Sequence, residues 1–286
     1  MPPTGGIVPG DYVLTEADFC HIASILHDHA GIHLPQAKAA LVYARLAKRL
    51  RALGLENFRD YCALVAGSDG LGERQKMVAA LTGDGTKFYR EADHFDHLRT
   101  RVLPALAARA RQGQPIRIWS AGCAGGEEPY TIALVLLSAM PDAARHDVRL
   151  LATDIDPQMV QQGRAAIYSE AALADVPADL RTKWFSERAG AGEPRWQAHE
   201  SLRDLIAFRE LNLFARWPMK KRFDAIFCRN VAIYVDAAKQ AELWMRFSAA
   251  LKPSGVLYVG QGECVSGPAA RHFAADGPAT WRRLPG

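Results

Sequence analysis

The residues best placed to do chemistry gather in one short stretch, Arg117 to Leu136 (RIWSAGCAGGEEPYTIALVL). An apolar run there stops at a glycine-rich turn, and Glu127, Glu128 and Pro129 follow directly. A strand, a glycine turn and a helix start together bring the backbone close to a nucleotide-like ligand. Two carboxylates at this position would repel a phosphate, so we expect a hydroxylated or cationic ligand instead.

A second candidate group is an acid at the end of a strand. The mostly apolar segment Val148 to Ala152 ends in Thr153, Asp154, Ile155 and Asp156. An acid at the tip of the second strand of a doubly wound sheet can accept hydrogen bonds from both hydroxyls of an adenosine ribose. It follows the glycine turn by about 30 residues rather than the ~20 of the dinucleotide fingerprint, and GxGxxG is absent, which disfavours NAD.

A third group follows the segment Phe223 to Cys228. This run (FDAIFC) is almost continuously apolar, as a parallel strand buried on both faces should be, and it leads into a polar stretch that includes Asn230 and Tyr234. The carboxyl ends of strands in an open α/β sheet line one crevice, where ligands bind. We therefore expect the glycine turn, Asp154 and this stretch to meet, although the fold alone does not choose a reaction.

The elements that must position these residues alternate between strand and helix, which predicts an α/β, doubly wound domain over residues 116–286. Residues 184–211 interrupt this alternation with charged and glycine-rich sequence. We expect them to form a small inserted antiparallel β-subdomain, with a hairpin turn at Gly190 and Gly192. A final antiparallel strand is expected near Ala279 to Arg283.

The N-terminal third predicts an all-α domain over residues 15–81. Thr15 resembles a helix N-cap, with Asp18 at the third helical position, and the first helix is expected to run through His27. Further helices are expected over residues 35–54, 58–65 and 72–81. Residues 1–14 are predicted to be a flexible arm, and residues 82–115 a loop and a linker helix.

The helix predicted over residues 35–54 has an apolar stripe formed by Val42, Leu46, Leu50 and Leu53. Its basic residues lie off this stripe, and the segment contains no acidic residue. A solvated helix usually mixes charges of both signs. The helix is therefore either an exposed face that happens to be basic, or a docking surface for an acidic helix or for nucleic acid. The basic residues are Lys38, Arg45, Lys48, Arg49 and Arg51.

The composition of the chain limits the classes of ligand, the cellular compartment and the metal or disulfide sites that we expect. The chain has 286 residues, 49% hydrophobic and 23% charged, and its net charge of +4 is too mild to indicate nucleic acid by itself. It has no apolar run of about 18 residues and no signal-peptide pattern, so we expect a cytoplasmic protein without membrane insertion. Five cysteines without a CxxC pair indicate neither disulfides nor zinc, and the histidines around residue 30 are not expected to bind a metal.

Several motifs together resemble one family. The segments AGCAGGEEPYTIA, TDID, NLF, FDAIFCRNVAIYVD and TKFYRE strongly resemble the CheR family, S-adenosylmethionine-dependent methyltransferases that methylate glutamates on bacterial chemotaxis receptors. The likeness covers about residues 15–280, and GEEPY followed by FCRNVxIY is highly specific. The resemblance implies a helical N-terminal domain, a doubly wound methyltransferase domain and a small inserted β-subdomain, which agrees with the reading of the elements above.

The resemblance also implies functional residues. The family holds S-adenosylmethionine, and its product S-adenosylhomocysteine, with residues at the positions of Asp84, Thr86, Arg90, Glu128, Asp154, Asn212, Leu213, Arg229 and Asn230. Arg90 and Tyr234 fall where the family places its proposed catalytic pair. The basic residues of 35–54 would then bind the cytoplasmic helices of a methyl-accepting chemotaxis receptor. The β-subdomain could add a receptor C-terminal peptide at its edge, and we expect a monomer that binds no nucleic acid.

Three departures from the family pattern leave alternatives open. Asp84 stands where the family usually has Asn, Gly85 replaces a larger polar residue, and Gln261 and Gly262 replace a His-Ser pair. The departures permit a catalytically impaired CheR-like protein that binds cofactor or receptor as a regulator. An RNA methyltransferase is disfavoured, because Tyr43 is the one aromatic residue among the basic residues of the predicted helix.

Overall fold

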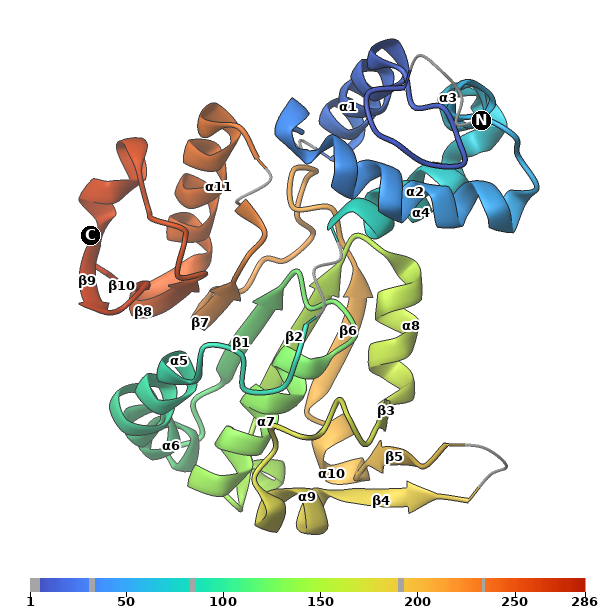
Figure 1. Cartoon of the computed structure of the whole chain (residues 1–286). Helices are drawn as coiled ribbons and strands as arrows, with labels where there is room; N and C mark the ends of the chain where they lie inside the picture. The colour runs from blue at the N-terminus through green and yellow to red at the C-terminus, as the bar shows by residue number, and fades with distance from the viewer. Residues whose placement is uncertain (1–5, 31–33, 83–85, 190–192, 233–234, 286) are drawn as a thin grey trace. The chain divides into compact units, whose positions relative to one another are not determined.

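The computed structural model describes residues 6–30, 34–82, 86–189, 193–232 and 235–285. The chain divides into two compact units (Figure 1), one made of residues 1–84 with 234–239 and the other of residues 85–233 with 240–286. The first unit is helical and the second is built on a β-sheet. This division is close to the predicted boundary between the helical domain and the rest of the chain.

The helical unit contains the four predicted helices. Thr15 and Asp18 form the predicted cap: the Asp18 N–H donates to Thr15 Oγ1 (3.1 Å) and the Thr15 N–H to Asp18 Oδ2 (3.0 Å). Gly54 ends the second helix in the left-handed conformation, with φ of 69°. The helices are α1 (Glu16–Ala30), α2 (Ala39–Leu53), α3 (Phe58–Ala66) and α4 (Leu71–Thr82), with short 3-10 turns at Gln36–Lys38 and Ser68–Gly70.

The apolar stripe of α2 is confirmed over three of its four residues. Val42, Leu46 and Leu50 are fully buried, whereas the side chain of Leu53 is 39% exposed. The prediction for Leu53 was wrong because it is the last residue of the helix, with no further turn to cover it. The stripe therefore packs the helix into its own unit and leaves Leu53, at its end, partly exposed.

The second unit contains a seven-stranded sheet in the order β6-β2-β1-β7-β8-β10-β9 (Figure 1). The first five strands are parallel and the last two antiparallel, which confirms the predicted doubly wound architecture. One of the antiparallel strands, β9, was not predicted. The strands are β1 (Ile116–Ala121), β2 (Val148–Asp154), β6 (Ile206–Glu210), β7 (Phe223–Cys228), β8 (Leu251–Val259), β9 (Phe273–Gly277) and β10 (Thr280–Arg283).

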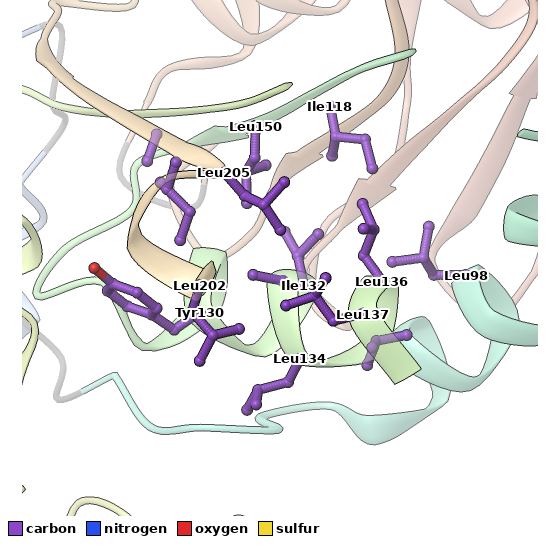
Figure 2. Packing of buried hydrophobic residues seen from close by; sticks show 14 of the residues in the cluster. Leu98, Ile118, Tyr130, Ile132, Leu134, Leu136, Leu137, Leu150, Leu202 and Leu205 are labelled. Carbon is purple, nitrogen blue, oxygen red and sulfur yellow. The ribbon is translucent and has the colours of Figure 1, made fainter. Parts of the chain in front are cut away.

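Helices cover both faces of this sheet. Ile116 and Ile118 of β1 belong to one apolar cluster, whereas Trp119 and Ala121 belong to the other, as the alternation of a strand requires. Figure 2 shows the first cluster, where residues of α7 such as Leu136 pack with Ile118. The helices are α5 (Ala92–His97), a π-helical turn (Leu98–Val102), α6 (Leu103–Arg111), α7 (Glu127–Ala139), α8 (Pro157–Ala165), α9 (Ala178–Trp184), α10 (Glu200–Arg203) and α11 (Ala237–Ala250), with 3-10 turns at Ala143–Arg145 and Gly267–His272.

A separate three-stranded antiparallel sheet, in the order β3-β5-β4, forms the small β-subdomain. It consists of β3 (Ile167–Ser169), β4 (Phe185–Arg188) and β5 (Arg195–Ala198). The predicted bounds of the insertion, residues 184 and 211, are therefore both wrong. The strand β3 lies before residue 184, and β6 joins the main sheet beside β2. The predicted hairpin turn at Gly190 and Gly192 lies outside the described residues.

In the described ranges, no helix is both long and apolar enough to cross a membrane. Within the same ranges, no group of three or more His, Cys, Asp or Glu side chains is arranged to hold a metal ion.

Candidate active site

The candidate site lies where the strand order of the main sheet reverses. The chain leaves β1 through α7 toward β2 on one side, whereas it leaves β7 through α11 toward β8 on the other (Figure 1). Because Ser120 pairs with Phe227 in parallel register, the residues after both strands emerge at one edge of the sheet. A crevice for ligands is expected at such a switch point. The three groups that the sequence singled out follow β1, β2 and β7, which confirms that they share this edge.

The glycine turn after β1 is held against the end of β2. The N–H groups of Gly122 and Cys123 both donate to the Thr153 carbonyl, at 2.8 and 2.9 Å. Gly122 has φ of 87°, and a Cβ there would lie 2.4 Å from Cγ2 of Val231. Glycine is required at this position both for its conformation and for the close approach to the segment after β7. The turn therefore presents bare backbone at the edge of the crevice.

Asp154 is fixed by main-chain donors on both of its oxygens. Oδ2 accepts from the Ala124 N–H (2.8 Å) and Oδ1 from the Asp156 N–H (3.0 Å). Burial raises the pKa of the Asp154 carboxyl, and these two hydrogen bonds oppose the rise. Each carboxylate oxygen keeps a second lone pair, so the anchored group can still accept hydrogen bonds from ligand hydroxyls.

Glu128 is held in the first turn of α7 by two side chains. Its Oε1 accepts from Ser120 Oγ (2.6 Å), and its Oε2 accepts from Arg229 Nη1 (3.1 Å). Burial raises the pKa of the Glu128 carboxyl, whereas the Arg229 charge and the Ser120 hydrogen bond act to lower it. Ser120 of β1, Glu128 of α7 and Arg229, which follows β7, are thus joined in one hydrogen-bonded cluster.

Arg229 is the centre of that cluster, and it contacts a residue that the sequence reasoning missed. Its Nε and Nη2 lie 3.3 and 3.2 Å from Glu91 Oε2. Glu91 Oε1 in turn lies 3.5 Å from Asn230 Nδ2. Glu91 directly follows Arg90 in the motif TKFYRE, and this adjacency to a candidate catalytic residue is the signal that could have found it.

Glu263 is a second residue that the sequence reasoning missed. Its Oε2 accepts from the main-chain N–H groups of Asn230 (2.9 Å) and Gly260 (2.6 Å). Asn230 has a left-handed backbone with φ of 58°, and the Glu263 carboxylate stabilises it by binding its N–H. The signal in the sequence was an acid shortly after an apolar strand that ends in glycine, a pattern close to that of Asp154.

Arg90 lies between two left-handed residues, Tyr89 (φ 52°) and Glu91 (φ 59°). Its carbonyl oxygen accepts a hydrogen bond from Arg229 Nη2. Its side chain is half-buried and has no ion-pair partner within the residues that the structure describes. Strained backbone of this kind persists where the surroundings fix it, and here the main chain of Arg90 is held against the buried cluster through its carbonyl.

Asn212, Leu213 and Thr86 are the remaining predicted cofactor residues that the structure describes. Asn212 forms a local turn, in which its Oδ1 accepts from the Phe214 N–H at 2.8 Å. Leu213 is buried, and its carbonyl accepts from Arg246 Nη1 at 2.8 Å. Thr86 is half-buried. Asp84, Gly85 and Tyr234 lie outside the described residues, so their predicted roles stay predictions.

The predicted docking residues, of which Lys38 lies in the 3-10 turn before α2 and the other four lie in α2, differ in what they contact. Arg45 donates to the carbonyls of Ala80 and Leu81, at 3.3 and 2.9 Å. Arg49 pairs with Glu73, and Arg51 lies 3.6 Å from the exposed carboxylate of Asp11. Lys48 is exposed and Lys38 half-buried. Part of the predicted docking charge therefore stabilises the unit itself.

Both parts of the chain are similar to known proteins. Residues 17–82 match the family model described as "CheR methyltransferase, all-alpha domain", and residues 84–277 match "CheR methyltransferase, SAM binding domain". A "Probable chemotaxis protein methyltransferase" of Rhizobium etli is 48% identical over 258 residues, covering 90% of this chain and 96% of its own. The "Chemotaxis protein methyltransferase" of Escherichia coli is 37% identical, covering 87% and 85% of the two chains.

Proposed function

The chain belongs to the CheR methyltransferase family, and on that premise we propose that it methylates glutamate side chains of chemotaxis receptors. The cofactor is S-adenosylmethionine, in keeping with the matched SAM-binding domain. The proposed product is a glutamate methyl ester. One observation carries the proposal: two oriented carboxylates, Glu128 and Asp154, stand beside a bare glycine turn at the switch point of the sheet.

The described residues fit this cofactor. Gly122 lets the turn after β1 lie close to the segment after β7, since a Cβ there would lie 2.4 Å from Cγ2 of Val231. Asp154 has acceptor capacity for the ribose hydroxyls, and Glu128 supplies negative charge toward a cationic ligand. Neither carboxylate would favour a phosphate. The cofactor, when bound, supplies a methyl group activated by its sulfonium charge.

The methyl transfer requires little of the protein beyond alignment of the two reacting groups. The acceptor carboxylate is already ionised at pH 7, so no general base is needed. Holding the reacting groups in attack geometry can lower the barrier by roughly 7–11 kcal/mol. Arg90 presents a guanidinium that can hold a carboxylate with two hydrogen bonds. We propose that Tyr234 either hydrogen-bonds the attacking group or lines the methyl channel.

The proposed substrate is the acidic helical region of a chemotaxis receptor in the cytoplasm. The basic residues of α2 support it, since Lys48 and Arg51 are exposed and able to meet acidic side chains. The three-stranded sheet could add a receptor C-terminal peptide as a further strand. We propose that the protein acts as a monomer and binds no nucleic acid.

The decisive experiment incubates the protein with tritiated S-adenosylmethionine and either receptor fragments or RNA. We expect label on the receptor fragment alone, released by mild base as an ester must be. Label on RNA, or base-stable label on protein, would contradict the proposal. Cofactor binding without label on either acceptor would instead indicate a catalytically impaired, regulatory protein.

A further inference from the structure

We propose that one face of β2 and β6, together with the segment 211–222, is a second docking surface for the acidic helical region of the receptor. The inference rests on the proposed function, which supplies the receptor as substrate. The surface belongs to the unit that contains the sheet, and it shares no residue with α2.

The connection from β6 to β7 lacks the helix that a crossover between parallel strands usually contains. β1, β2 and β7 are followed by the helices α7, α8 and α11, whereas all residues of 211–222 are described and none is helical (Figure 1). The segment lies on the same face of the sheet as α11, because Trp217 and Met219 pack with the apolar cluster that contains Trp119. An irregular segment therefore stands where a helix would otherwise cover this second face.

The side chains that β2 and β6 direct to the second face are those of a face open to solvent. Residues of both strands in the first apolar cluster alternate with Arg149, Leu151, Ala207 and Arg209, which therefore point to the second face. Both arginines are exposed, and Leu151 and Ala207 are half-buried. Parallel strands covered on both faces would carry apolar residues at these positions. Two strands about 4.8 Å apart offer roughly the width of one helix, which is about 10 Å across.

Cations predominate around this face. Asp147, an exposed acid before β2, is paired with Arg117 at 2.6 Å. Its pKa is lowered by the hydrogen bond from Arg117 and by the charges of Arg149 and Lys221, so the end of the segment lies beside the start of β2. The resulting excess of positive charge attracts an acidic partner. The exposed cations that form no ion pair within the described ranges are Arg149, Arg209, Arg216, Lys220, Lys221 and Arg222, and the exposed acids on adjoining elements are Asp147, Asp204, Glu210 and Glu242.

Arg246 of α11 holds the segment in place. Its guanidinium lies over the ring of Trp217, 4.1 Å from the centroid, and donates to the carbonyls of Leu213 (2.8 Å) and Ala215. The Trp217 Nε1–H also donates to the Leu213 carbonyl, at 3.0 Å. Trp217 and Met219 are half-buried, so both keep apolar surface toward solvent. A surface that is fixed before binding loses little conformational entropy when the partner arrives.

The segment begins at the candidate active site, which favours the substrate as the partner. The Leu211 N–H donates to the Asp154 carbonyl at 2.9 Å, and the predicted cofactor residues Asn212 and Leu213 follow directly. A receptor helix whose glutamate reaches the methyl group can therefore continue along the segment. Cations beside half-buried apolar side chains suit an acidic amphipathic helix. RNA would instead stack its bases on open aromatic rings, and Arg246 already covers the ring of Trp217.

The test measures methyl-transfer kinetics with receptor fragments, in full-length wild type and in the double reversal Arg149→Glu and Arg209→Glu. We expect the KM for receptor to rise roughly 3- to 30-fold, with kcat and the affinity for S-adenosylhomocysteine unchanged, because these exposed charges act on docking alone. The matched control reverses Arg99 and Arg101, two exposed arginines of the π-helical turn that packs on the first face, and should keep the wild-type KM. An unchanged KM in the Arg149 and Arg209 reversal would overturn the inference.

A further variant tests shape without changing charge. Ala207→Tyr places a ring on the open face and removes no side-chain contact beyond one methyl group, so a folded variant should also show a raised KM for receptor. If the reversal of Arg149 and Arg209 weakens binding of single-stranded RNA but leaves receptor kinetics unchanged, the face binds RNA and the inference is wrong. Wild type that methylates no receptor fragment would refute the proposed function, whereas active wild type with equally active variants refutes the docking surface alone.

Discussion

The guanidinium of Arg49 donates two hydrogen bonds to the carboxylate of Glu73, at 2.9 and 2.7 Å. The Tyr61 hydroxyl donates a third, at 3.2 Å, and Glu73 is buried. This bidentate ion pair joins α2 to α4 within the helical unit. One of the basic residues expected to dock a receptor is therefore also an internal anchor, and tests of docking must use other positions.

Replacing Arg49 should destabilise the protein. Arg49→Gln leaves the buried Glu73 carboxylate without its counter-charge, and we expect a loss of about 2–4 kcal/mol in the free energy of unfolding. Urea denaturation followed by circular dichroism measures it. Lys48→Gln, on the same helix but exposed, should change stability by no more than about 0.5 kcal/mol. Equal stability of the two variants would show that the pair contributes nothing.

Receptor docking can be tested without this damage. The double reversal Lys48→Glu and Arg51→Glu should raise the apparent Michaelis constant for receptor about 3- to 30-fold and leave cofactor affinity unchanged, because exposed charges act mainly on encounter. The wild-type reaction should slow as salt is added. Kinetics with receptor fragments at two ionic strengths provide the measurement. If the reversed protein is as active as wild type and neither responds to salt, the basic face has no docking role.

Asp154 should be needed for cofactor binding. Loss of a charge-assisted hydrogen bond costs about 1.5–3 kcal/mol, so Asp154→Ala should weaken binding of donor and product alike by roughly 10- to 150-fold. Glu210→Gln is a matched control, since Glu210 pairs with Asp154 across the sheet but is exposed. Calorimetry that finds wild-type affinity in Asp154→Ala would remove this residue from the site.

Glu127 should make stability depend on pH. Burial raises the pKa of its carboxyl from 4.5 to about 7, and its Oε2 has no hydrogen-bond partner within the described residues. The folded protein then binds the extra proton between these values, so stability falls as pH rises through that window. Glu127→Gln removes this loss. The free energy of unfolding of the variant, relative to that of wild type, should therefore be about 2–3 kcal/mol higher at pH 8 than at pH 5.

The measurement for Glu127 is urea denaturation of both proteins at the two pH values. The exposed residue Glu200 supplies the comparison, because Glu200→Gln should follow the wild-type pH dependence. A stability difference between Glu127→Gln and wild type that is the same at pH 5 and pH 8 would contradict the assignment of a raised pKa.

Much of the main sheet could be predicted because its signals are local. Asp154 ends one apolar strand, Glu128 lies in the first turn of the helix that follows another, and the carboxyl ends of such strands are known to meet. Glu91 and Glu263 were missed because they reach the site from the start of α5 and from the segment after β8. Their partners follow β7, and pairing over that distance leaves no periodic trace in the sequence.

The predicted bounds of the β-subdomain were wrong for a different reason. A strand of three residues such as β3 is too short to show alternation, and its partner β5 lies beyond an intervening helix. β6 follows irregular, charged sequence and was therefore assigned to the insertion, although its pairing with β2 places it in the main sheet. The side-chain pattern of one strand does not reveal which neighbour it pairs with.

The order of the strands also matters while the chain is being synthesised. β1 and β7 are neighbours in the sheet, but β2, the small sheet and β6 all lie between them in the chain. A nascent chain that has emerged only through β6 carries Glu91 and Glu128 but not Arg229. It would hold two acids without their shared counter-ion, which disfavours early closure of this half of the sheet. The ability to bind the methyl donor is therefore acquired late in translation, once the segment after β7 has left the ribosome.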